Sequence, residues 1–521
     1  MKKIAFLLLA CMRLYSDDLS WEQPQYLSTV SFNASDPRIV MDRNGNLVAA
    51  WIENGIVVAN SQPFQGSWGA LPIQISEFGA SSLELVMDSL GNATAIWTQE
   101  GVIQSASSPW NGACTLPVNL SEESAFSPQI AVDSSGNIAA IWECNGLIQS
   151  MIKPFSANWP QNPDTISDPS SLGDSPQIAI GEDGTIVAVW HSKTFTGTDA
   201  IFTNQTTVGG KWFAFSGVLS NGKYSCVRPQ VAVKEDGSSM AAWFRYDLSG
   251  FNYSNVIVQT VFGNRMGVWN DPIDLSPPGS KNPDELVLHT SYNSIGIGLV
   301  LWTNCYDYCT FSLEGSVYNS LHWIPIMKFV ESNVYLYDQS FTVSPQGTAS
   351  AAYMMCDSSS ELPIVQAFEA NTYAVIPNHG AQVTISNGGS NGYPRITGTQ
   401  IGSNRYVSAV WLNNNGSNTR VQVANGQVPV IVPPTSLAVV QSFHDCGIFK
   451  EYYNTLSWQG MIAAGATKWL IFRNGIWIGE TAIDVLEFID SNVSQNEPTV
   501  YGVAIQLENG DQSAISTINF P

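Results

Sequence analysis

A short two-strand pattern recurs along most of this chain and limits what the chain can fold into. In its clearest copy, residues 128–142, two runs rich in Ile, Val and Ala flank the turn Ser-Ser-Gly-Asn. Gly136 can adopt the positive φ of a tight hairpin turn, and Pro128 precedes the first run, where its missing N–H costs no ladder bond. Runs without polar alternation are typical of strands covered on both faces. The pattern predicts a buried β-hairpin.

The same spacing of a glycine and an aromatic residue is found along the chain. The glycine lies six residues before the aromatic residue in seven copies: Gly45/Trp51, Gly91/Trp97, Gly136/Trp142, Gly184/Trp190, Gly237/Trp243, Gly296/Trp302 and Gly347/Tyr353. Pro37, Pro128, Pro176 and Pro229 lie eight residues before that glycine. Pro394, Gly402 and Trp411 form an eighth, expanded copy.

A second motif follows the hairpins: a tryptophan, then an apolar stretch that ends in serine. Its clear copies are Trp68 to Ser76, Trp110 to Ser121, Trp159 to Ser167, Trp212 to Ser220 and Trp269 to Ser276, and looser ones end at Ser332 and Ser386. One more strand-like run, such as residues 55–59, lies between hairpin and tryptophan. Each unit is therefore about four strands in roughly 45–55 residues, the size of a propeller blade.

The last unit lacks this second motif, and the beginning of the chain supplies one. Residues 21–28, from Trp21 to Ser28, precede the first hairpin and match the missing strand. Pairing of this strand with the last unit would remove the open edges of the array. We therefore expect an all-β chain with a closed β-propeller of about eight four-stranded blades. Seven blades are the alternative if the limits of the sixth and seventh units, which lack the proline, are assigned wrongly.

After Gln427 the repeat ends, and residues 428–434 form a proline-marked linker. Short strand-like runs with Asn-Gly turns then predict a small β-sandwich over residues 432–521. The segment resembles a fibronectin type III domain in Pro433-Pro434, Trp458, Arg473-Asn-Gly475, and Tyr501 with Val503 and Ala504. It departs from that family in a longer stretch over residues 441–453. The resemblance implies binding or spacing.

The first sixteen residues resemble an export signal, with Lys2 and Lys3 before the short apolar run Ile4 to Ala10. Leu8-Leu-Ala-Cys11 resembles a bacterial lipobox, in which Cys11 would carry the lipid; the alternative is cleavage near Ser16. We thus expect a signal peptide over 1–16, a propeller over 17–428 and an exported protein. Its compartment would be the periplasm, the outer membrane surface or the extracellular space.

Charge and cysteine content exclude several function classes. A net charge of −22 opposes binding to phosphate backbones, so we expect no nucleic-acid partner. The N-terminal lipid would be the only membrane attachment. Seven cysteines remain besides Cys11. Cys305 and Cys309 could form a loop disulfide, with Cys356 as a competing partner. No histidine pair has metal-ligand spacing, so we expect neither a metal nor a cofactor.

The connections after the repeated aromatic residue indicate where a ligand would bind. They are short in the first three units and longer in the next four, at 191–200, 244–255, 303–308 and 354–363. All would lie on one face, around the channel mouth, and loops on a rigid scaffold carry function. We expect a protein or glycan ligand there, bound by residues including Glu143, His191, Arg245, Tyr246 and Asp307. Neutral insertion is the alternative explanation.

The main functional prediction is a non-catalytic recognition or scaffold protein. Asp42, Asp88 and Asp133 only superficially resemble the Asp-box of sialidase-type propellers, because Ser-before-Asp and Thr-Trp-after-Gly are missing. We expect these aspartates to cap their own turns. The alternative is a sialidase-like or other glycan-active enzyme, hydrolase or lyase. In it, Arg38, Arg228 and Arg395 at the blade entries would converge, with Tyr246 and Glu143 completing the site.

Overall fold

The computed structural model describes residues 20–520, apart from 111, 250–251, 280–285, 294–295, 306–310, 320–322, 324–325, 333–335, 344–347, 357–361, 372–377, 380–381, 402–403, 430–433, 446, 448–449, 461–465, 492, 508–512 and 514. The described residues form strands and turns and include no helix. Accordingly, no helix that could cross a membrane occurs in this part of the chain. The predicted all-β class is confirmed.

Residues 20–429 form eight antiparallel sheets, each built mostly from consecutive strands. The first four sheets contain β3 (Ala34–Met41), β4 (Leu47–Glu53), β5 (Ile56–Gln62) and β6 (Ile73–Gln74); β7 (Ala80–Met87), β8 (Ala93–Gln99), β9 (Val102–Ser108) and β10 (Val118–Asn119); β11 (Ala125–Val132), β12 (Ile138–Cys144), β13 (Leu147–Lys153) and β14 (Asp164–Thr165); and β15 (Gly173–Ile180), β16 (Thr185–Lys193), β17 (Asp199–Thr207) and β18 (Gly217–Val218).

The next four sheets follow the same plan. They contain β19 (Ser225–Val233), β20 (Ser239–Ser249), β21 (Asn252–Gly263) and β22 (Ile273–Asp274); β23 (Leu288–Tyr292), β24 (Ile297–Cys305), β25 (Phe311–Asn319) and β26 (Met327–Ser332); β27 (Leu336–Val343), β28 (Thr348–Cys356), β29 (Pro363–Asn371), β30 (Asn378–His379) and β31 (Val383–Thr384); and β32 (Ser390–Ile401), β33 (Asn404–Asn414) and β34 (Thr419–Pro429) with β1 (Ser20–Trp21) and β2 (Gln25–Tyr26).

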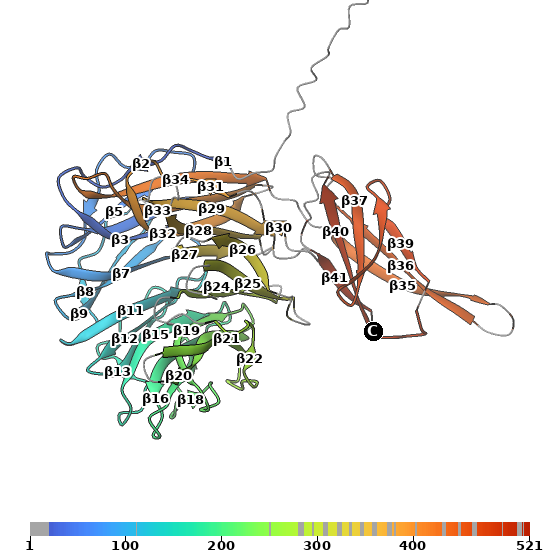
Figure 1. Cartoon of the computed structure of the whole chain (residues 1–521), viewed down its shortest axis with the longest axis horizontal. Coiled ribbons are helices and arrows are strands. Elements are labelled where there is room, and N and C mark those ends of the chain that lie inside the picture. Colours follow the sequence, from blue (N-terminus) through green and yellow to red (C-terminus); the bar gives the residue numbers. More distant parts are fainter. Residues whose placement is uncertain are drawn as a thin grey trace, which may run out of the picture.

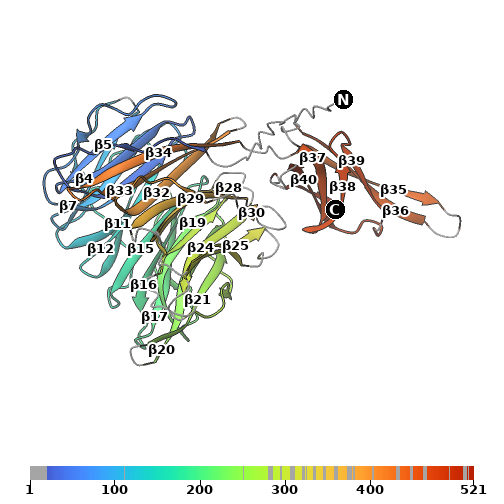
Figure 2. The same ribbon diagram turned by 45° about the horizontal axis from the view of Figure 1, so that its top comes forward.

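The first strands of the eight sheets face one another in a propeller-like arrangement. β3, β7, β11, β15, β19, β23, β27 and β32 each contact the next in this order, and β32 also contacts β3. Figures 1 and 2 show the eight sheets side by side in one part of the molecule. A pocket of about 470 Å³ lies among the far ends of these strands, lined by residues such as Met41, Met87 and Val132. The first strands therefore surround a central channel.

The N-terminal segment completes the last sheet. In β1 and β2, Ser20 pairs with Gln427 and Gln25 with Val423 of β34. The Ser28 hydroxyl then accepts a hydrogen bond from the Val421 amide at 2.9 Å. Ser76 plays the same role for the Val57 amide of the first sheet, at 2.8 Å. The predicted pairing between residues 21–28 and the last unit is thus present, and the serine of the second motif secures the third strand of its sheet.

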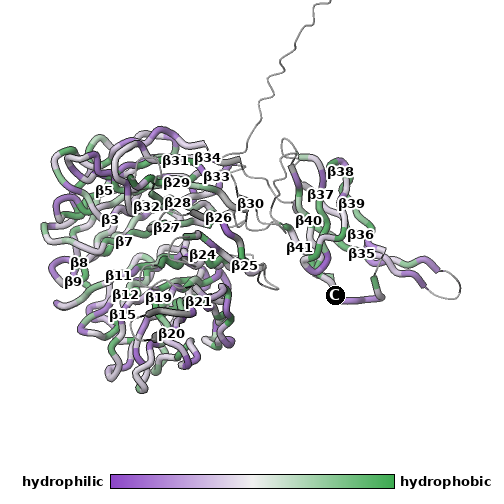
Figure 3. The backbone as a smooth tube through the Cα atoms, in the orientation of Figure 1, coloured by the Kyte–Doolittle hydropathy of each residue, from purple (hydrophilic) through white to green (hydrophobic). Residues whose placement is uncertain are grey.

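The repeated tryptophans pack between neighbouring sheets. Trp51, Trp97, Trp142, Trp190, Trp243, Trp302 and Trp411 are at most 1% exposed. Trp97 of the second sheet, for example, packs with Ala50 and Ile52 of the first. Figure 3 shows hydrophobic segments inside the molecule. Burying one such indole contributes on the order of a few kcal/mol, so these contacts hold the sheets together.

A bulge opens most of the first strands, and the sequence pattern did not reveal it. The pairing register shifts near the start of the strand, for example between Asp174 and Gln177. The residue before the entry proline adopts a left-handed φ in each case, such as 51° at Ser175 and 54° at Arg228. A bulge bends a strand and redirects its side chains. Three residues of these bulges, Ser127, Ser175 and Arg228, line a common pocket.

A second part of the molecule follows the proline-marked linker (Figures 1 and 2). One sheet contains β35 (Thr435–Asp445), β36 (Lys450–Gln459) and β39 (Glu487–Asp490), and the other β38 (Ile476–Ala482), β37 (Ala466–Arg473), β40 (Thr499–Leu507) and β41 (Ser516–Phe520). Trp458, Trp469 and Tyr501 share one core between the two sheets. The long stretch 441–453 extends the β35–β36 hairpin, in which Phe443 contacts Tyr452.

Candidate functional site

A polar pocket of about 510 Å³ lies at the start of the first strands of the third, fourth and fifth sheets. Its lining is rich in amides, hydroxyls and charged groups: Ser127, Gln129, Asp174, Ser175, Pro176, Gln177, His191, Asp199, Val227, Arg228, Pro229, Gln230 and Tyr246. The bulges described above supply Ser127, Ser175 and Arg228. The ends of β16 and β20 supply His191 and Tyr246. This is the face on which the second and third strands of each sheet connect.

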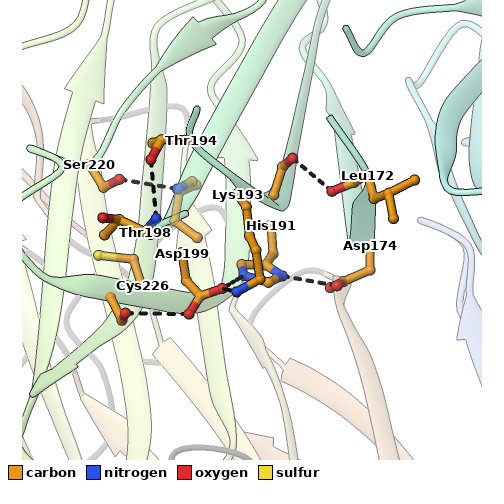
Figure 4. Close-up of polar contacts among 12 residues, drawn as sticks. Leu172, Asp174, His191, Lys193, Thr194, Thr198, Asp199, Ser220 and Cys226 are labelled. Atoms are coloured by element: carbon orange, nitrogen blue, oxygen red, sulfur yellow. Dashed lines mark hydrogen bonds and ion pairs between the residues drawn. The ribbon is translucent and has the colours of Figure 1, made fainter. Parts of the chain in front are cut away.

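His191 bridges two aspartates at the wall of this pocket (Figure 4). Its Nδ1 lies 2.9 Å from Oδ2 of Asp174, and its Nε2 lies 3.1 Å from Oδ1 of Asp199. Both ring nitrogens therefore face carboxylate oxygens, which only accept hydrogen bonds when ionised. The imidazole must donate from both nitrogens, so the arrangement favours the imidazolium.

The pKa values of the three groups agree with this charge pattern. Burial lowers the pKa of His191, but hydrogen bonds and charges from Asp174 and Asp199 outweigh burial and raise it. Burial raises the pKa of Asp174, but His191 outweighs burial and the pKa is lowered. The pKa of Asp199 is lowered in the same way by Lys193, whose Nζ is 2.5 Å from Oδ1, and by His191. The two carboxylates consequently favour the protonated form of His191 between them.

Glu143 adjoins this network from the third sheet. Burial raises the pKa of Glu143, and the negative charge of Asp174 raises it further. The two carboxyl groups thus have pKa values shifted in opposite directions, that of Glu143 upward and that of Asp174 downward. Such a divergence is a common way to prepare one acid and one base at a single site.

Tyr246 and Ser225 complete the surroundings of Asp199. The Tyr246 hydroxyl lies 3.4 Å and the Ser225 hydroxyl 3.3 Å from Oδ2 of Asp199, on the side of the carboxylate away from His191. Arg228 brings a second fixed cation to the pocket. The described residues contain no cluster of three or more groups suited to a metal ion.

The structure brings only some of the predicted ligand-binding residues together at the pocket. His191 and Tyr246 line the pocket, and Glu143 adjoins it through Asp174. Arg245 does not: neighbouring strand residues point to opposite faces, and its guanidinium lies over Tyr224 and 3.1 Å from Asp274. Asp307 lies outside the described residues, as do Cys11 and Cys309. Cys356, the competing disulfide partner, is a free thiol.

Several pocket residues were not predicted. Asp174, Asp199, Gln129, Gln177 and Gln230 line the pocket. The three glutamines share one sequence position, directly after the entry proline, and this shared position is a signal that could have found them. The predicted convergence of three arginines is realised in part. Arg38 and Arg395 interact electrostatically, whereas Arg228 lines the pocket on other sheets.

The predicted aspartate caps are present in the hairpin turns. Asp42 accepts hydrogen bonds from the Asn44 and Asn46 amides, each at 2.8 Å. Asp88 and Asp133 accept the equivalent bond from Asn92 and Asn137. The three carboxylates are buried in the turns. They therefore stabilise the hairpins.

Comparisons with known proteins yielded structures but no sequence relatives. No family model matches the chain, and no curated protein matches it. The fold is similar to that of the polysaccharide lyase Uly1, at 8% identity and a TM-score of 0.44 over 75% of this chain and 89% of the lyase. It is also similar to an α-L-arabinofuranosidase, Arb93A from Fusarium graminearum, at 10% identity and a TM-score of 0.35 over 78% of this chain and 97% of that protein.

A third similar structure is a subtype N11 neuraminidase-like protein from a flat-faced bat influenza virus isolate (A/flat-faced bat/Peru/033/2010), at 8% identity and a TM-score of 0.35 over 67% of this chain and 87% of the other. At these identities the likeness concerns the fold alone. The similar structures include a polysaccharide lyase and an arabinofuranosidase, so the prediction of a non-catalytic recognition or scaffold protein, and of a chain more likely not to be an enzyme, is corrected here and not kept. Any assignment of activity to this chain must come from its own pocket.

Proposed function

We propose that this protein is a glycan-active enzyme and that a sugar unit binds in the pocket between the third and fifth sheets. The observation that carries the proposal is a polar pocket lined by Asp174, with a second carboxyl group, Glu143, interacting with Asp174; the opposite pKa shifts of the two groups support it. Gln129, Gln177 and Gln230 supply amides, which can donate to and accept from sugar hydroxyls. The pocket volume of about 510 Å³ suits a small ligand or one part of a polymer.

The proposed chemistry is acid–base cleavage of a glycosidic bond. Glu143, which retains its proton to higher pH, donates it to the leaving oxygen. Asp174, which remains ionised, stabilises the positive charge that develops on the sugar or activates a water molecule. His191 is a positioning residue: it fixes Asp174 and, since both of its nitrogens are occupied, it does not itself accept a proton.

The proposal can be tested with the purified protein and a panel of neutral and acidic polysaccharides. Hydrolysis is followed by new reducing ends and elimination by the ultraviolet absorbance of an unsaturated sugar. On a cleaved substrate we expect Glu143→Gln and Asp174→Asn to lower kcat by about 100-fold or more, as expected for loss of a general acid or base. Asp164→Asn, at an exposed carboxylate of β14, is the matched control and should retain activity. Full activity in both site variants would refute the assignment.

We propose further that the eight sheets form a closed eight-bladed propeller, supported by the pairing of β1 and β2 with β34 and by the contact between β32 and β3. We keep as proposals the signal peptide over 1–16, lipidation at Cys11, export, and a fibronectin type III-like domain over 432–521. Two packed sheets and the core around Trp458 support the last of these.

A further inference from the structure

Side chains directly after the entry position of the first strand interact with one another in the first, second, third and eighth sheets. In the first sheet, Nε and Nη2 of Arg38 donate to the two carboxylate oxygens of Glu84 in the second sheet, at 3.0 and 2.8 Å. Gln129, at the same position of the third sheet, donates to Oε1 of Glu84 at 3.5 Å. In the first three sheets, the side chain at this position therefore reaches its counterpart on a neighbouring sheet.

Arg395 occupies this position in the eighth sheet and makes the same hydrogen bond to the backbone as Arg38. Both arginines follow a proline that is itself preceded by a left-handed residue, Tyr393 at φ 53° and Asp36 at φ 48°. Both donate from Nη1 to the carbonyl of that proline, Arg395 at 2.8 Å and Arg38 at 3.1 Å. In Arg38 the remaining Nε and Nη2 edge holds a carboxylate, whereas no described residue accepts a hydrogen bond from the same edge of Arg395.

The counterpart of Arg395 on the next sheet is Arg38, a like charge. Burial lowers the pKa of Arg395, and the charge of Arg38 lowers it further. Glu84, Asp338 and Asp36 attract the guanidinium, but among the described residues only the Pro394 carbonyl accepts a hydrogen bond from it. The two guanidinium groups thus interact unfavourably, and Arg395 lacks the paired carboxylate hydrogen bonds that Glu84 gives Arg38.

We propose that the channel binds a carboxylate group of a ligand at the Nε and Nη2 edge of Arg395. The bound group would take the place, relative to Arg395, that Glu84 takes relative to Arg38, and would offset the repulsion between the two arginines. A guanidinium fork matches a planar carboxylate in two parallel hydrogen bonds, which a spherical anion cannot reproduce. The ligand is a sugar acid or a simple carboxylic acid. The inference does not depend on the proposed activity, since binding alone is at issue.

The test measures the unfolding midpoint of the whole protein with glucuronate, acetate, glucose or chloride at equal ionic strength. A ligand that binds only the folded state raises the midpoint. We expect glucuronate to raise it and glucose and chloride to leave it unchanged. An equal effect of acetate would assign the site to simple carboxylates, and no effect of acetate would assign it to a sugar acid. No shift with either carboxylate, or an equal shift with chloride, would overturn the proposal.

Two variants separate a binding role from a structural one. Arg395→Gln should abolish the carboxylate-dependent shift while the ligand-free protein keeps its midpoint or gains, because a charge repelling Arg38 is removed. Arg265→Gln removes an exposed arginine and should retain the full shift. A lower ligand-free midpoint in Arg395→Gln together with an unchanged carboxylate shift would show that Arg395 serves only the fold.

Discussion

At the scale of single residues, two features of the structure require glycine in the hairpin turns: a positive φ and the lack of space for a Cβ. Gly136 has a φ of 86°, and a Cβ on it would lie 2.8 Å from Cδ2 of Phe155 and 3.0 Å from Oδ2 of Asp88 in the preceding sheet. Gly91 has the same relation to Asp42, at 3.0 Å. The Asn-Gly and Ser-Gly turns were recognised from the sequence as hairpins, but their packing against the neighbouring sheet was not.

A pair of substitutions separates the two constraints. Gly136→Ala should lower the free energy of unfolding by about 2–4 kcal/mol, from left-handed strain together with overpacking. Gly101→Ala has the same strain, at φ 84°, but its Cβ would have 3.5 Å to the nearest atom, so we expect about 1 kcal/mol. Urea unfolding measures both changes. Equal losses would show that the contact between neighbouring turns costs nothing.

The network of His191 makes stability depend on pH in a defined direction. The raised pKa of His191 stabilises the folded protein fully at pH values below about 6.5, the pKa of histidine in the unfolded chain. This stabilisation is lost as the pH rises through the pKa of His191 in the folded protein. The lowered pKa values of Asp174 and Asp199 stabilise the folded protein at pH values above about 4. This stabilisation is lost as the pH falls through the pKa values of the two aspartates in the folded protein.

We therefore expect His191→Gln to cost most stability between about pH 4 and 6.5, and progressively less as the pH rises above that range. Urea unfolding at a series of pH values, on wild type and variant, checks this. Asp164→Asn serves as the control, because this exposed residue of β14 lies outside the network. A difference between wild type and His191→Gln that is constant from pH 5 to pH 9 would contradict the imidazolium assignment.

At the scale of elements, the sequence identified hairpins because each combines a turn glycine with a buried aromatic residue. The second motif was also recognised, and the structure explains its serine, which accepts the third strand's amide, as Ser276 does from Val258 at 2.9 Å. The predicted loop over residues 244–255 was wrong in part: β20 and β21 continue as paired strands to Ser249 and from Asn252. Polar residues at strand ends do not distinguish a loop from an extended hairpin.

The candidate site was only half predictable for a related reason. His191 and Tyr246 were found because they lie in the longer predicted connections, 191–200 and 244–255. Asp174 was not, because it precedes the entry proline of the fourth sheet in a strand start that resembles the others. Arg245 was misplaced because alternation along a strand decides which neighbour faces the pocket, and a bulge elsewhere in the sheet can shift that register.

At the scale of the whole molecule, the beginning of the chain is part of the last sheet. Leu27 packs with Trp51 of the first sheet and Val410 of the last, so this segment joins both. A chain that begins at residue 29 loses β1, β2 and the Ser28 cap, and we expect its unfolding midpoint to fall by roughly 5 °C, corresponding to several kcal/mol. A chain that begins at residue 20 is the control and should melt like the full chain. Thermal unfolding followed by circular dichroism compares them.

That pairing also determines when, during synthesis of the chain, the last sheet can be completed. Ser20 and its partner Gln427 are 407 residues apart in the chain. β1 and β2 are synthesised long before their partner strand β34, and they remain unpaired until β34 has been synthesised. The interval leaves the edges of the first and later sheets accessible to other chains, and a nascent-chain chaperone would act in that window.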